Sequence, residues 1–136
     1  MAVALSERYA AVAYSGKPTI EAWDLETGVL VYAGAIQDNP YLYDLVIRGS
    51  TVEAVSVDHE QVHLYSADLE RPGPLVETVL PVPGFIDWYE ISVGVALSEA
   101  GVAVIGQDEM EEEYQLWLIH RETGQVRSFA AEQPLL

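Results

Sequence analysis

An internal repeat is the feature that most constrains the fold of this chain. The pentapeptide VALSE occupies residues 3–7 and again residues 95–99, and the tripeptide ETG occupies 26–28 and again 122–124. A weaker copy fills the stretch 45–73. The separation of the matched segments fits two units of about 46 residues each. The 136 residues therefore predict three consecutive copies of one supersecondary unit.

Each unit contains four short runs rich in Val, Ile, Tyr and Trp, separated by turn residues, which indicates successive antiparallel strands. The expected strands are 2–6, 9–14, 19–24 and 29–33, then 43–47, 51–57, 61–66 and 75–80, then 89–97, 101–105, 114–120 and 125–129. The segment 110–120, where glutamates precede an apolar stretch, fits a helix locally, but the alignment of 114–120 with 19–24 favours a strand. We expect an all-β fold with three units, at about 1–35, 40–80 and 87–131.

Residues 19–28, TIEAWDLETG, resemble the third strand and following turn of a WD40 repeat, and the Trp-Asp pair is Trp23 and Asp24. Quinoprotein-like propellers have similar strands and turns, so the resemblance implies a β-propeller with three four-stranded antiparallel blades. The equivalent pairs in the other units are Tyr65-Ser66 and Ile119-His120. No unit has the Gly-His pair of WD40 repeats, so the hydrogen-bonded tetrad of that family is not expected.

The residues of this motif have expected structural roles. We expect Trp23 to pack between blades as a large apolar plate. Asp24 is expected to brace the turn that follows it, and Gly28 and Gly124 to supply the positive φ that such turns need. His120, at the end of a strand, is expected to be a satisfied structural residue.

Three blades do not close a ring, because closed propellers generally have about four to eight blades. Residues 132–136 resemble the segment 37–42 between the first two units, so we expect the chain to stop where another blade would begin. The sequence therefore predicts half of a six-bladed propeller, completed by a head-to-tail homodimer in which the third unit of one copy packs on the first unit of the other. The alternatives are a fragment of a longer propeller and a half-ring completed by a different protein.

Charge narrows the class of partner. The chain has 22 acidic and 6 basic residues and a formal net charge of -16. This charge repels nucleic acids and anionic membranes, so neither is an expected partner. No apolar run approaches the roughly 20 residues needed to span a membrane, and residues 1–9 lack a signal-peptide pattern, which predicts the cytoplasm. The absence of cysteine excludes disulfides, thiolate metal sites and thiol catalysis.

The propeller resemblance implies that the connections between second and third strands, and those between blades, emerge on one face. That face would combine carboxylates with aromatic rings, namely Asp38, Tyr41, Asp58, Glu60, Phe85, Asp87, Trp88, Asp108, Glu111, Glu112 and Glu113. Carboxylates attract cations over distance, and aromatic rings hold arginine or ammonium groups at contact. The sequence therefore predicts a non-enzymatic protein-interaction module that binds a basic protein or peptide and needs no cofactor.

Two other functions are the alternatives. One is a propeller hydrolase with carboxylates at the channel mouth, and the other is a structural propeller half whose charge serves solubility. The three histidines have no evident nucleophile partner in the sequence. A metal site of Asp58, His59, Glu60 and His63 has no specific pattern, and both histidines flank a hairpin turn, where they are expected to face solvent. We therefore expect no catalytic, cofactor or metal site.

Overall fold

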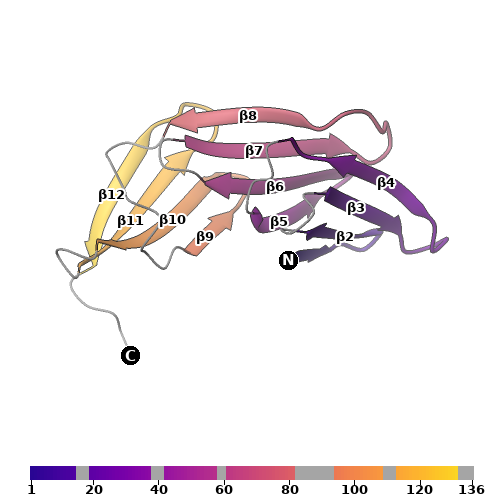
Figure 1. Cartoon of the computed structure of the whole chain (residues 1–136), viewed down its shortest axis with the longest axis horizontal. Helices are drawn as coiled ribbons and strands as arrows, with labels where there is room; N and C mark the ends of the chain where they lie inside the picture. Colours follow the sequence, from indigo (N-terminus) through magenta and orange to yellow (C-terminus); the bar gives the residue numbers. More distant parts are fainter. Residues whose placement is uncertain (15–18, 38–41, 58–60, 82–93, 109–112, 132–136) are drawn as a thin grey trace.

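The computed structural model describes residues 1–14, 19–37, 42–57, 61–81, 94–108 and 113–131, which form twelve strands in three sheets. Sheet 1 contains β1 (Ala2–Leu5), β2 (Tyr9–Tyr14), β3 (Thr19–Asp24) and β4 (Leu30–Ala35). Sheet 2 contains β5 (Leu42–Arg48), β6 (Thr51–Val57), β7 (Gln61–Asp68) and β8 (Val76–Pro81). Sheet 3 contains β9 (Gly94–Leu97), β10 (Gly101–Asp108), β11 (Glu113–His120) and β12 (Val126–Ala131). Each sheet is antiparallel with its strands in chain order (Figure 1), which confirms the expected all-β fold.

The burial pattern shows that the sheets are stacked with sheet 2 in the middle. Strand β2 alternates between buried and half-buried side chains, which is the period-two pattern of a strand with one covered face. Strand β6 is buried at every residue from Val52 to Val57, because sheet 2 is covered on both faces. The inner strands β1, β5 and β9 contact one another in that order, and the outer strands splay away from them (Figure 1).

Two buried apolar clusters hold the stack together. The cluster between sheets 1 and 2 includes Ala11, Ile20, Val52 and Leu69. The cluster between sheets 2 and 3 contains Val55, Val57, Val62, Leu64, Leu80, Leu97, Val102, Val104, Trp117 and Ile119. Because successive side chains of a strand point to opposite faces, sheet 2 packs one face on sheet 1 and the other on sheet 3.

The turns that close the hairpins confirm the roles expected of the repeat motif. The carboxylate oxygen Asp24 Oδ1 accepts hydrogen bonds from the N–H groups of Glu26 and Thr27 at 2.8 and 3.4 Å. His120 holds the equivalent turn in sheet 3, where its Nδ1 accepts from the N–H of Thr123 at 3.3 Å. Gly28 and Gly124 have φ of 73° and 69°, a left-handed conformation that favours glycine.

One expectation about the motif is wrong. Strand β7 extends to Asp68, which pairs with the first residue of β6, so the equivalent of the Trp23-Asp24 pair is Ala67-Asp68, two residues later than expected. Trp23 lies on the face of sheet 1 that points away from sheet 2, because its neighbour Ala22 belongs to the cluster with sheet 2. In the part of the chain that the structure describes, no sheet covers this face, so the packing of Trp23 between blades stays a prediction.

The first strand expected in the third unit is described only from Gly94, and residues 89–93 lie outside the described residues. The described part of the segment that fits a helix locally, Glu113–His120, is strand β11, as the repeat predicted. Among the residues that the structure describes, no helix is long and apolar enough to span a membrane.

Candidate functional site

Most residues predicted to form the interaction face lie outside the described residues. These are Asp38, Tyr41, Asp58, Glu60, Phe85, Asp87, Trp88, Glu111 and Glu112. The backbones of Asp108 and Glu113 are described, and they pair in register where the β10–β11 hairpin ends. The structure therefore places the strands that carry the predicted face and leaves the partner-binding role of its side chains a prediction.

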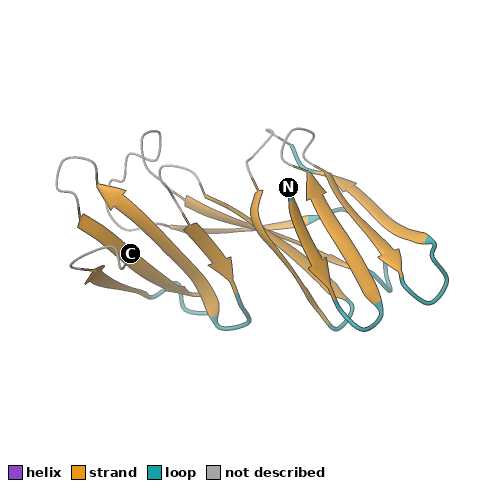
Figure 2. Cartoon of the chain, turned by 90° about the horizontal axis from the view of Figure 1, so that it is seen from below, coloured by secondary structure: helices purple, strands orange, loops and turns teal. Residues whose placement is uncertain are grey.

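The strand directions divide the molecule into two ends. The turns β1–β2, β3–β4, β5–β6, β7–β8, β9–β10 and β11–β12 lie along one edge, seen in teal in Figure 2, which we call the turn end. The remaining connections of the antiparallel sheets join strand ends on the opposite side, which we call the connection end. In the sequence, the predicted interaction residues fall in the segments that join these strand ends or at two of the strand ends themselves, Asp108 and Glu113.

Basic and acidic residues are divided unequally between these ends. The five arginines lie in or next to turns of the turn end, at positions 8, 48, 71, 121 and 127. The connection-end segments 15–18, 37–41, 58–60, 82–93 and 108–113 contain a single lysine, Lys17, and ten acidic residues. Those acidic residues are Asp38, Asp58, Glu60, Asp87, Glu90, Asp108, Glu109, Glu111, Glu112 and Glu113.

The best-buried ion pair at the turn end joins sheets 2 and 3. Glu53 on β6 is only 2% exposed. Its Oε1 accepts a hydrogen bond from Arg48 Nε at 2.7 Å and one from Arg121 Nη1 at 3.1 Å, and its Oε2 contacts Arg121 Nη2. Burial lowers the pKa of Arg121, and the neighbouring charge of Arg48 lowers it further. Two guanidinium groups thus neutralise one buried carboxylate, which is the condition under which a charge is tolerated in an interior.

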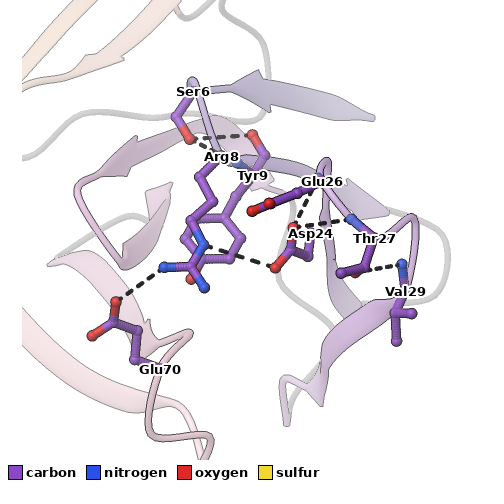
Figure 3. Close-up of polar contacts among 8 residues, drawn as sticks. All are labelled: Ser6, Arg8, Tyr9, Asp24, Glu26, Thr27, Val29 and Glu70. Carbon is purple, nitrogen blue, oxygen red and sulfur yellow. Dashed lines mark hydrogen bonds and ion pairs between the residues drawn. The ribbon is translucent and has the colours of Figure 1, made fainter.

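A more exposed arginine joins sheets 1 and 2, as Figure 3 shows. Arg8 lies over the ring of Tyr9, with Nη1 3.4 Å from Glu70 Oε1 in sheet 2 and Nε 3.8 Å from Asp24 Oδ2 in sheet 1. Because its side chain is more than half exposed, this pairing contributes little to stability. Arg8 is thus paired with carboxylates at the turn end, as Arg48 and Arg121 are paired with Glu53.

A cleft of about 860 Å³ separates the outer part of sheet 1 from that of sheet 2. Tyr32 and Gly34 of β4 line one side, and strands β6 to β8 line the other. The Tyr32 hydroxyl is buried without a hydrogen-bond partner among the described residues, and burial raises the pKa of Tyr32. A Cβ at residue 34 would collide with the Tyr32 ring, so the glycine leaves the space in which the ring lies. The wall of the cleft therefore contains a buried phenol whose hydroxyl has no hydrogen-bond partner among the described residues.

Three polar residues share the sheet 2 wall of this cleft. Ser56 and His63 are cross-strand neighbours, and His63 Nδ1 lies 2.7 Å from Glu77 Oε1. The ring of His63 stacks on Tyr65 with centroids 6.3 Å apart. The expectation that His63 faces solvent is therefore wrong, because it is half-buried and paired. A hydroxyl, an imidazole and a carboxylate on one wall are the groups that activate a nucleophile in hydrolases.

The comparisons with known proteins bear on the fold. No protein-family model and no curated protein sequence matches the chain. Among solved structures, it is similar to the crystal structure of Kluyvelomyces marxianus Hsv2, a β-propeller protein, with a TM-score of 0.50 and 17% identity. The match covers 98% of this chain and 46% of that one, so the chain spans about half the length of that protein.

A similarity at this level of identity shows the fold alone. The chain folds as three blades of a β-propeller, in which each sheet is one blade, and this is consistent with half of a propeller. The finer assignment to WD40 or quinoprotein-like repeats stays a prediction. In the described ranges, no group of three or more His, Cys, Asp or Glu side chains is arranged to hold a metal ion.

Proposed function

We propose that this propeller is a non-enzymatic protein-interaction module that binds a basic protein or peptide at its connection end. The observation that carries the proposal is the separation of charge between the two ends. Three of the five arginines are engaged with carboxylates at the turn end. The sequence of the segments that join strands at the other end contains ten acidic residues and one lysine. A surface of this composition attracts cationic partners over distance.

The proposal predicts a binding reaction with a strong dependence on salt. The probe is a synthetic peptide of alternating arginine and glycine, titrated against the purified chain by calorimetry. Affinity should fall at least about tenfold when the ionic strength rises from about 0.05 to about 0.5 M, because the interaction of exposed charges is screened. An affinity that does not change with salt contradicts the proposal.

A charge-matched pair of variants locates the binding. One variant changes Glu111, Glu112 and Glu113 to glutamine at the connection end, and the other changes the exposed turn-end residues Glu7, Glu26 and Glu122 to glutamine. The two variants have the same net charge, so an effect of overall acidity would weaken peptide binding equally in both. The proposal requires that the connection-end variant lose affinity about tenfold and the turn-end variant much less. Equal losses in the two variants would place binding elsewhere.

A hydrolase is the second candidate function, and the polar wall of the cleft is the observation that favours it. Ser56, His63 and Glu77 line one cavity in the order hydroxyl, imidazole, carboxylate. If the wall is catalytic, an activated ester such as p-nitrophenyl acetate is hydrolysed, and the rate falls at least about a hundredfold in Ser56→Ala. The control is Ser128→Ala, an exposed serine on β12 of sheet 3, which should leave the rate unchanged. A rate equal to that of buffer rejects this candidate.

A further inference from the structure

The two interfaces between sheets use one equivalent turn position of the repeat, which a hydrogen bond within each sheet defines. In each sheet, the residue after the third strand donates its N–H to the carbonyl of the residue before the second strand. The donors are Leu25 in sheet 1, Leu69 in sheet 2 and Arg121 in sheet 3, at 2.7, 2.7 and 3.2 Å. These three residues therefore occupy one equivalent turn position in the repeat.

In both interfaces this turn position takes part in the packing against the preceding sheet. Leu69 is buried in the cluster with Ala11, the third residue of β2, and Arg121 binds Glu53, the third residue of β6. The equivalent positions in the interface between sheets 1 and 2 thus hold two buried apolar residues of one cluster, and those in the interface between sheets 2 and 3 hold an ion pair. The third residue of β10 is Ala103, and it lies on the face of sheet 3 that points away from sheet 2.

The two faces at the ends of the stack have the same features but are uncovered. Sheet 1 exposes apolar side chains on the side away from sheet 2, with Leu25 at 47%, Val3 at 68% and Leu5 at 75% exposure. Sheet 3 has a mainly apolar hollow of about 340 Å³ over Gly101 and Ala103. Contiguous exposed apolar surface of this kind marks an interaction site. Leu25 is equivalent to Leu69, and Ala103 is equivalent to Ala11, so the apolar pair of the first interface is present again, divided between the two ends.

Charge on the two end faces agrees with this pairing. Glu21 in β3 is equivalent to Tyr65 in β7, and Arg127 in β12 is equivalent to Tyr32 in β4, as the strand registers show. Tyr32 and Tyr65 belong to one cluster between sheets 1 and 2 and line the same cleft. If sheet 1 packs on sheet 3 as sheet 2 packs on sheet 1, Glu21 and Arg127 approach each other with opposite charges.

We propose that a second copy of this chain covers both end faces, with Leu25 of each copy seated in the hollow over Gly101 and Ala103 of the other. The interface is head-to-tail and occurs twice, which closes six blades into a ring with two-fold symmetry. The proposal concerns the end faces and does not depend on peptide binding at the connection end, so either can fail alone.

The first test is the mass of the purified chain by size exclusion with light scattering at micromolar concentration. The ring predicts about 30 kDa, twice the 15.0 kDa of one chain. Leu25→Glu should give a monomer, because it places a carboxylate in the apolar hollow. The matched control is Val76→Glu, which adds the same charge at a 60% exposed valine of sheet 2 and should stay dimeric. A wild-type monomer, an oligomer larger than a dimer, or a dimer that survives Leu25→Glu overturns the proposal.

A single variant and a compensating double variant test the predicted contact between Leu25 and Ala103. Ala103→Glu alone should abolish the dimer, because it buries a carboxylate beside Leu25. The double variant Ala103→Glu with Leu25→Arg should restore the dimer at low salt, because it installs at the ring closure the pair that Glu53 and Arg121 form inside the chain. Circular dichroism confirms that each variant is folded. Failure of the double variant to recover the dimer shows that these two positions do not meet.

Discussion

Changing Glu53 to alanine is expected to lower the free energy of unfolding by about 3–5 kcal/mol, measured by urea denaturation. The change leaves Arg48 and Arg121 next to each other without the carboxylate that both now bind. The control is Glu99→Ala, since Glu99 is exposed and lies 3.8 Å from Arg48, and its loss should cost less than about 1 kcal/mol. Equal effects of the two changes would show that the buried pair adds nothing to the stability of this interface.

A double variant separates the loss of the ion pair from the loss of packing. Glu53→Ala combined with Arg121→Leu gives these positions the residue types of their equivalents Ala11 and Leu69, which are buried in one cluster between sheets 1 and 2. Replacing a buried ion pair by apolar residues is often neutral, so the double variant should recover most of the stability that Glu53→Ala loses. If it recovers none, the cost of Glu53→Ala does not come from the unpaired guanidinium groups.

Trp117→Ala is expected to cost about 3–5 kcal/mol, because this tryptophan is 7% exposed and belongs to the cluster between sheets 2 and 3. Trp23→Ala should cost clearly less in the folded monomer, since Trp23 lies on an uncovered face. Both changes are made in the Leu25→Glu background, so that association does not add to either value. Thermal denaturation followed by fluorescence gives the comparison, and a larger loss at Trp23 would contradict the assignment of the faces.

The fold could be predicted because each expected strand aligns with strands at the equivalent positions of the other units. The approach to β11 is rich in glutamate and fits a helix locally, and only its alignment with β3 favoured a strand. The same alignment failed at Ala67-Asp68, because β7 has eight residues where β3 has six. Trp23 can pack between blades only against a further blade on the outer side of sheet 1. The described residues place no sheet there, so this expectation stays a prediction.

The candidate sites were less predictable, for physical reasons. The interaction residues of the sequence lie mostly in connections outside the described ranges, so their role stays a prediction. The sequence predicted carboxylate-rich connections on one face, but it did not predict that the arginines gather in or next to the turns of the opposite end. Glu53 and Arg121 are far apart in sequence, and the only signal was the equivalence of Arg121 with Leu69. The pairing of Ser56 with His63 could have been predicted from the sequence. In the β6–β7 hairpin Val57 pairs with Val62, so the next residues outward, Ser56 and His63, are opposite each other.

Gly34 has a consequence for the cleft beyond the fold of β4. Any residue with a side chain at this position would push the Tyr32 ring out of its present place, and the far end of that ring forms part of the cleft wall. The width of the opening and the position of the buried phenol are therefore controlled together by the smallest residue of the strand. A single methyl group there would reshape the entrance without touching the polar wall opposite.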